Sequence, residues 1–163
     1  MCIRDRILPE AIKAISANLI DYMTNLFNVL YDKGIFPLEW ATAIIVPIHK
    51  KGSKSVPNNF RGISLLSILS KVYTSILTFR LACWAEDNGK LSQSQAGFRR
   101  GYSTIDHIHT LTQIVSNGLY GDRRHKTFCV FIDFNKAFNT VKHDKLWEVL
   151  RKAGVSSKFI KTL

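Results

Sequence analysis

The sequence has little of what marks secreted or membrane proteins. No apolar run approaches the ~20 residues that a helix needs to span a bilayer, so no membrane partner is predicted. Its start, MCIRDR, lacks the apolar core of a signal peptide. The three cysteines, Cys2, Cys83 and Cys129, are odd in number, widely spaced and without a CxxC pair. We therefore expect an intracellular protein, nuclear or cytoplasmic, that is not secreted.

Acidic residues are scarce relative to basic ones. Lys and Arg number 23 against 12 Asp and Glu, a formal net charge of +11 at pH 7. This surplus favours a polyanionic partner, either nucleic acid or an anionic membrane surface, although a merely basic soluble protein has the same balance. Hydrophobic residues make up 46% and aromatic residues 11%, which argues for a folded core and against disorder.

Apolar residues recur at helical spacing in three stretches. The first predicts a helix from Pro9 to a stop at Gly34. The second predicts a helix that ends near Gly89, and the third follows Ser103 and Asp106, which have the spacing of a capping box. The positions expected to face inward are Ile12, Ile15, Leu19, Met23, Leu26 and Leu30 in the first, Leu65, Leu69, Val72, Ile76, Phe79 and Cys83 in the second, and Ile105, Ile108, Leu111 and Val115 in the third.

Three shorter stretches predict strands. Residues 43–48 are apolar and β-branched, and Pro47 restricts them to a sheet edge or a bulge. After a polar loop, residues 60–63 are a candidate return strand. Five consecutive apolar residues, Phe128–Ile132, are typical of a strand buried on both faces. Further helices are expected over His143–Lys152, closed by Gly154, and from Ser156 or Ser157 to Leu163, where the chain stops in mid-element as a truncated domain would.

Asp133 stands directly after this apolar run. A carboxylate at the mouth of a buried strand is costly to ionise without a partner. It can protonate, cap the following turn or meet a cation, and capping is a common role of aspartate at strand ends. Position alone therefore leaves open whether Asp133 is structural or a metal ligand.

Four blocks carry the most specific motifs. They are residues 37–52, ending IIVPIHKKG; 58–73, NNFRGISLLSILSKVY; 92–108, SQSQAGFRRGYSTIDHI; and 128–141, FCVFIDFNKAFNTV. In this order they resemble the start of the fingers and the segments Y/F-R-P-I-S-L-L, Q-x-G-F-R-x-G-x-S-T-x-D and F-x-D-x-x-K-A-F-D-x-V of non-LTR (LINE-type) retrotransposon reverse transcriptases. The resemblance covers roughly residue 8 to the end of the chain.

The resemblance implies a right-hand polymerase. We expect a helix-rich α/β (α+β) fold with an antiparallel fingers hairpin and one buried palm strand. Residues 7–126 would form the N-terminal helix and fingers, and residues 127–163 the start of a truncated palm. Residues 1–6 fit poorly with the rest of the chain and are interpreted as a non-native start.

The resemblance also implies a site for RNA-directed DNA synthesis. Asp133, as the catalytic carboxylate, and the carbonyl of Phe134 would be ligands for two Mg²⁺ ions. Phe138 matches the aromatic that packs under the sugar and excludes a 2′-hydroxyl, although an ordinary core phenylalanine is the alternative. The amides of Lys136 and Ala137 would hold triphosphate oxygens.

Basic residues elsewhere match the family's nucleotide and template contacts. Arg61 would grip the incoming triphosphate, and Lys50 on the facing turn would add positive charge. A solvated loop arginine is an equally good interpretation of Arg100. The residues expected near the template are Gln95, Arg99 and Arg100. The expected partners are an RNA template, a DNA primer, dNTP and the remainder of the polymerase chain.

Three departures from the family pattern limit this prediction. Asn139 stands where the family has aspartate, and Gly62 replaces a proline. The family's second carboxylate pair, in an aromatic-x-D-D hairpin, is not found after Asp133, because Asp144 stands alone and the superficially similar residues 120–123 lie upstream. We therefore predict that these 163 residues have no polymerase activity alone.

Two other hypotheses stay open. One is a non-catalytic RNA- or DNA-binding remnant, or a domesticated fragment. The other is a basic helical scaffold unrelated to polymerases. A zinc site is not predicted, because His107 and His109 are two residues apart and do not face the same side of a helix.

Overall fold

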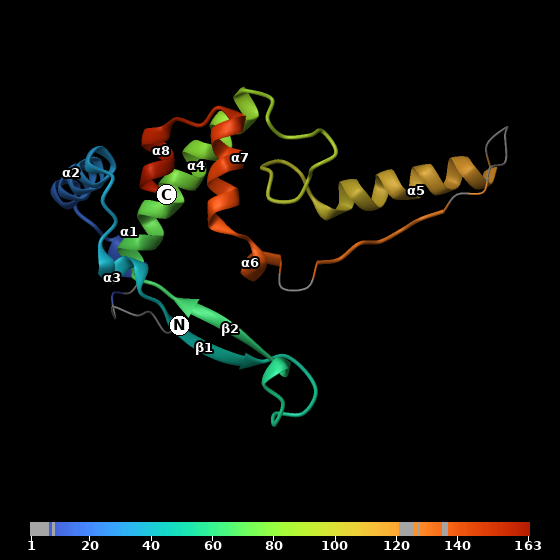
Figure 1. The fold of residues 1–163 in the computed structure, drawn as a ribbon, viewed down its shortest axis with the longest axis horizontal. Helices are drawn as coiled ribbons and strands as arrows, with labels where there is room; N and C mark the ends of the chain where they lie inside the picture. Colours follow the sequence, from blue (N-terminus) through green and yellow to red (C-terminus); the bar gives the residue numbers. More distant parts are fainter. Residues whose placement is uncertain (1–6, 8, 121–125, 127, 135–136) are drawn as a thin grey trace. The chain divides into compact units, whose positions relative to one another are not determined.

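The computed structural model describes residues 7, 9–120, 126, 128–134 and 137–163. They form two compact units, Met1–Arg80 with Val149–Leu163, and Leu81–Glu148. Most of the elements are helices, and the two strands pair with each other (Figure 1). In chain order the elements are α1 (Pro9–Lys13), α2 (Ala17–Lys33), α3 (Leu38–Ala41), β1 (Ile44–His49), η1 (Pro57–Asn59), β2 (Phe60–Leu65), α4 (Ile68–Asp87), α5 (Thr104–Tyr120), α6 (Ala137–Thr140), α7 (His143–Ala153) and α8 (Ser157–Thr162).

The first predicted helix is two helices. α1 ends at Lys13, and α2 begins after Ser16, whose backbone is extended with φ −68° and ψ 158°. Serine favours this N-cap position, while the apolar spacing continues across the break. The spacing therefore predicted a single helix where there are two. The predicted stop is confirmed, because Gly34 is left-handed with φ 61° and its N–H donates to the carbonyls of Leu30 and Tyr31.

The core of the first unit is aromatic and joins α2, α3 and α4. It consists of Phe27, Leu30, Trp40, Tyr73 and Leu77. The ring of Tyr73 lies 5.2 Å from that of Phe27 and 5.8 Å from that of Trp40, between centroids. Tyr73 is thus the centre of the cluster, with 2% of its surface exposed.

Periodicity predicted the buried faces of α2 and α4 only in part. Leu30 is buried as expected, but Leu19 and Leu26 are exposed. In α4 the buried residues are Ile68, Ser70, Tyr73 and Leu77, whereas Ile76, Phe79 and Cys83 are exposed. α4 has apolar residues on several sides, so its sequence does not single out the face that packs.

The C-terminal helices follow the prediction closely. α7 ends before Gly154, which is left-handed with φ 100°. The hydroxyl of Ser156 accepts the N–H of Phe159 at 3.2 Å and caps α8. α8 contacts α2, where the Nζ of Lys158 lies 2.7 Å from the Oδ1 of Asp32.

The predicted antiparallel hairpin is confirmed. β1 pairs with β2 in a register that sets Pro47 opposite Gly62, and β2 runs on to Leu65 (Figure 1). Both strands are edges of a two-stranded sheet, which is where a strand tolerates proline.

Two predictions for the second unit are wrong. Residues 128–134 adopt no strand and are exposed, with Val130 at 82%. A strand requires a hydrogen-bonded partner, and among the described residues the only sheet is the β1–β2 pair. One of the two bonds of the predicted capping box is formed at the start of α5, because Asp106 accepts the N–H of Ser103 at 2.6 Å. The apolar face of α5 is nevertheless uncovered, and Ile105 and Ile108 are exposed.

Across the ranges described, no helix combines the length and apolar character that crossing a membrane requires.

Candidate nucleotide and nucleic-acid site

Two basic side chains project from one end of the hairpin. Arg61 in β2 lies opposite Ile48 of β1, and the N–H of Lys50 donates to the carbonyl of Asn59 at 2.8 Å. Lys50 follows β1 by one residue, so its backbone bond to Asn59 places Lys50 and Arg61 at the same, loop-side end of the hairpin. The turn is held by the side chain of Asn59, which donates to the carbonyl of Ser53 at 2.8 Å. Lys50 and Arg61 are both exposed, which leaves two cations open to an anionic ligand.

Asp133 and Phe134 lie on an exposed stretch outside any helix or strand. The described residues contain no group of three His, Cys, Asp or Glu side chains that could hold a metal ion. One carboxylate and a backbone carbonyl are too few hard ligands for two Mg²⁺ ions. The residues present therefore do not fit a two-ion site, and Lys136, predicted to hold triphosphate, lies outside the described residues.

Phe138 is not a core residue. It lies in the short helix α6 next to Ala137, and both side chains are exposed. The ring of Phe138 meets the ring of Phe98 edge to face, with centroids 6.0 Å apart and planes at 87°. Phe98 was not predicted as a site residue, although it is the phenylalanine of the Q-x-G-F-R segment.

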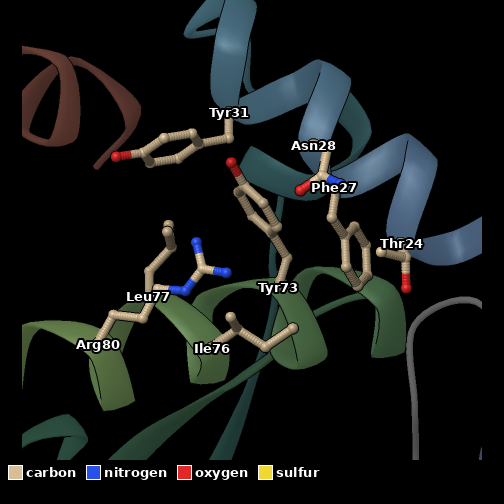
Figure 2. A pocket seen from close by; sticks show the side chains of 8 residues that line it. All are labelled: Thr24, Phe27, Asn28, Tyr31, Tyr73, Ile76, Leu77 and Arg80. Atoms are coloured by element: carbon tan, nitrogen blue, oxygen red, sulfur yellow. The ribbon is translucent and has the colours of Figure 1, made fainter.

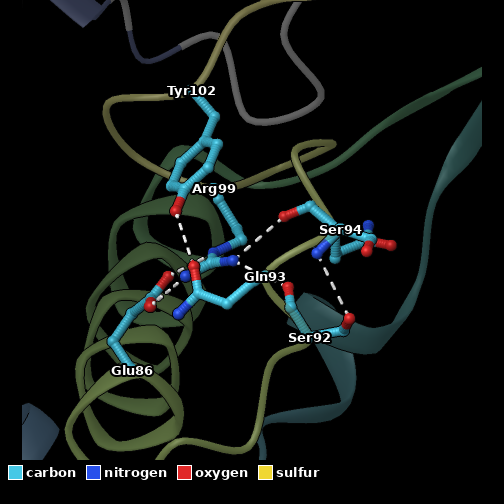
Figure 3. A network of polar contacts seen from close by, with 7 residues as sticks. Glu86, Ser92, Gln93, Ser94, Arg99 and Tyr102 are labelled. Atoms are coloured by element: carbon cyan, nitrogen blue, oxygen red, sulfur yellow. Dashed lines mark hydrogen bonds and ion pairs between the residues drawn. The ribbon is translucent and has the colours of Figure 1, made fainter. Parts of the chain in front are cut away.

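Arg99 is occupied by contacts within its own unit (Figure 3). Its Nε and Nη2 donate to the two carboxylate oxygens of Glu86 at 2.8 and 2.7 Å. Its Nη1 donates to the carbonyls of Ser92 and Gln95 at 2.8 and 3.2 Å. The guanidinium carbon lies 4.4 Å from the centre of the Tyr102 ring, and 6% of the side chain is exposed. Four of the five guanidinium N–H groups are thus satisfied.

This geometry is at odds with the predicted role of Arg99 as a template contact. The bidentate ion pair joins the end of α4 to the loop before α5, and it lowers the pKa of the Glu86 carboxyl through the hydrogen bonds from Arg99. Glu86 and Arg99 are thirteen residues apart in the sequence, so no helical or strand periodicity indicated that they would pair. Arg99 therefore shapes the loop instead of presenting its charge.

The other two predicted template residues differ from each other. The side chain of Gln95 donates to the carbonyl of Gly97 at 3.1 Å and so folds back on its own loop. Arg100 is exposed. Arg100 is therefore the predicted template residue whose charge is open to a phosphate.

A cavity of about 210 Å³ separates α2 from α4 in the first unit. Figure 2 shows Thr24, Phe27, Asn28 and Tyr31 lining it from α2, and Tyr73, Ile76, Leu77 and Arg80 from α4. The hydroxyl of Tyr73 is buried, and none of the residues that the structure describes forms a hydrogen bond with it. Burial raises the pKa of this hydroxyl, assisted by Tyr31 and opposed by Arg80.

Comparison with known proteins defines the class. A model of the family "Reverse transcriptase (RNA-dependent DNA polymerase)" matches residues 48–163, which include the hairpin from Ile48 onward, the Arg99 loop and Asp133. The chain therefore belongs to the reverse transcriptase family. The match begins within β1 and takes in three of the four sequence blocks whole.

The curated relatives are proteins of mobile elements, as expected for the non-LTR (LINE-type) branch of that family. The chain is 34% identical over 149 residues to the probable RNA-directed DNA polymerase from transposon BS of Drosophila melanogaster, covering 91% of this chain and 16% of that protein. It is 31% identical over 140 residues to the probable RNA-directed DNA polymerase from transposon X-element of the same species, covering 85% and 15%. It is 29% identical over 124 residues to the Pol polyprotein from the type-1 retrotransposable element R2 of Popillia japonica, covering 76% and 16%.

The chain spans about one sixth of the length of these relatives.

Proposed function

We propose that the chain is part of an RNA-directed DNA polymerase of a LINE-type mobile element, and that alone it binds nucleic acid without extending a primer. The family match over residues 48–163 carries the first half of this proposal. The second half rests on Asp133, which is exposed, and on the described residues, which contain no group of three side chains able to hold a metal ion. The formal net charge of +11 at pH 7 attracts the chain to a polyanion such as nucleic acid.

Within that polymerase the hairpin would serve as the fingers. Arg61 and Lys50 are proposed to hold the triphosphate of a dNTP, which their exposure and their position at the same end of the hairpin support. Phe138, with Ala137 and Lys136 before it, is proposed to border the sugar and phosphates. Residues 127–163 are proposed as the start of the palm.

Divalent metal would be supplied to a site completed by the remainder of the polymerase. Asp133 and the carbonyl of Phe134 are proposed as the ligands that this chain contributes, and Mg²⁺ as the ion because both are hard oxygen donors. An RNA template and a DNA primer are the proposed partners.

The test of this proposal is the affinity of the chain for a labelled single-stranded RNA, measured at increasing salt concentrations. Each neutralised phosphate lowers the log affinity by about 0.7 per tenfold increase in salt. We expect Arg61→Ala and Lys50→Ala to reduce this slope or to weaken dNTP binding, and Asp133→Asn to leave RNA binding intact. Affinity that does not depend on salt would contradict the proposal.

A second candidate is a non-catalytic binding remnant, which Asn139 in place of the family aspartate favours. Asp133→Ala in the complete product of the element separates the two candidates. Loss of DNA synthesis supports the polymerase, and unaltered function of the complete product supports the remnant.

A further inference from the structure

Phe98 has an unusual backbone. Among the described residues it is the only one other than glycine whose φ is positive, at 62°. An aromatic residue rarely adopts this left-handed conformation, and such strain persists only where the surroundings impose it. Its side chain is 95% exposed, so burial of the ring does not compensate for the strain. Glycine or asparagine would adopt this backbone conformation at a lower energetic cost than the phenylalanine that occupies the position.

The residues around Phe98 impose this conformation. Ala96, two residues before, is buried, and its carbonyl accepts the N–H of Arg99 at 3.3 Å. Arg99, directly after, is fixed by its bidentate pair with Glu86 and by the ring of Tyr102 (Figure 3). The turn is therefore anchored on both sides while the ring between the anchors points to solvent.

The loop carries an exposed aromatic ring and, two residues later, an exposed cation. Phe98 is followed, after the anchored Arg99, by the exposed Arg100. The edge-to-face contact with Phe138 supports one side of the Phe98 ring and leaves most of its surface free. An exposed apolar ring with an exposed cation two residues along the chain suits one nucleotide of a single strand, with the base stacked on the ring and the phosphate at the cation.

We propose that Phe98 stacks on a base of single-stranded RNA, that Arg100 contacts the adjoining phosphate, and that Arg99 is the positioning residue that holds the ring outward. This inference rests on the proposed function, since it specifies how the nucleic acid is bound. It also replaces the predicted direct contact of Arg99 with an indirect role.

The test is binding of a fluorescein-labelled 12-nucleotide RNA to the 163-residue chain, measured by anisotropy at several salt concentrations. Phe98→Ala is expected to lower the affinity about 5- to 150-fold, the value of one base–aromatic stack, with no change in salt slope. Arg100→Ala is expected to reduce the slope by about 0.7. Phe98→Trp retains the affinity, and the matched control Phe79→Ala, at an exposed ring on α4, leaves it unchanged.

Phe98→Asn separates recognition from folding. Asparagine tolerates a left-handed backbone, so this variant is expected to melt at the same or a higher temperature while binding as weakly as Phe98→Ala. If Phe98→Asn bound RNA as tightly as wild type, or had a melting temperature well below that of wild type, the ring would have a structural role and the inference would be wrong. RNA binding unaffected by Phe98→Ala overturns the inference alone, whereas no RNA binding by the wild-type chain overturns the proposed function with it.

Discussion

Replacement of Tyr73 by phenylalanine should stabilise this protein. The Tyr73 ring packs at the centre of the aromatic core, but its hydroxyl is buried and has no hydrogen-bond partner in the described part of the chain. A buried polar group left unsatisfied costs about 1–3 kcal/mol, whereas the ring contacts with Phe27 and Trp40 survive the change. Removing the hydroxyl oxygen enlarges the neighbouring cavity of about 210 Å³ only slightly, so the energetic cost of the added empty space is small.

We expect Tyr73→Phe to raise the free energy of unfolding by about 1 kcal/mol, the lower end of that range. For a chain of this size that corresponds to an increase of about 2–4 °C in melting temperature. The assay is urea unfolding followed by circular dichroism, with thermal melting alongside. Tyr22→Phe, at an exposed tyrosine of α2, is the matched control and should change neither value.

The pH dependence gives an independent check. Burial raises the pKa of Tyr73 above its ordinary value of 10.0, so the folded state favours the neutral hydroxyl. The stability from this difference is present below pH 10 and is lost as pH rises through the higher folded pKa. Tyr73→Phe should therefore lose less stability than wild type above pH 10. A variant less stable than wild type by 1 kcal/mol or more would refute the reasoning, because it would mean that the hydroxyl is hydrogen-bonded in the cavity.

Two further predictions concern the Arg99 anchor and the end of α2. Hydrogen bonds from Arg99 lower the pKa of Glu86, so their stabilising effect is present above the ordinary pKa of 4.5 and is lost as pH falls through the folded value. Glu86→Gln should accordingly weaken the dependence of the melting temperature on pH between pH 3 and pH 6. A pH profile like that of wild type would argue against the ion pair. Gly34→Ala should lower the free energy of unfolding by about 1–2 kcal/mol in urea, because φ is 61° and the new Cβ would lie 3.1 Å from the Lys161 side chain. A neutral result there would mean that the helix end can rearrange.

Local rules predicted the parts of the fold that depend on a few neighbouring residues. Gly34 ends α2 because only a left-handed residue closes the helix there, and Ser156 caps α8 through its own hydroxyl. The hairpin was predicted from the apolar, β-branched residues 43–48, a polar loop and a candidate return strand at residues 60–63. At both helix ends the determining contact lies within a few residues.

Features that depend on distant partners were not predictable from the pattern. Residues 128–132 have the composition of a buried strand, but burial needs a partner strand, and the described residues offer none beside them. The sequence motif predicts Arg99 as a template contact, whereas in the structure Arg99 pairs with Glu86, thirteen residues away. The family motifs point to this block of residues, but they carry no information on the ion pair that holds Arg99.

Primer extension tests the central claim most directly. The purified 163-residue chain is mixed with a DNA primer annealed to an RNA template, with dNTPs and Mg²⁺, and binding of the same primer–template is followed in the same sample. We predict salt-sensitive binding without extension, since one carboxylate does not assemble a two-ion site. Clear extension of the primer, or no binding at low salt, would contradict the account.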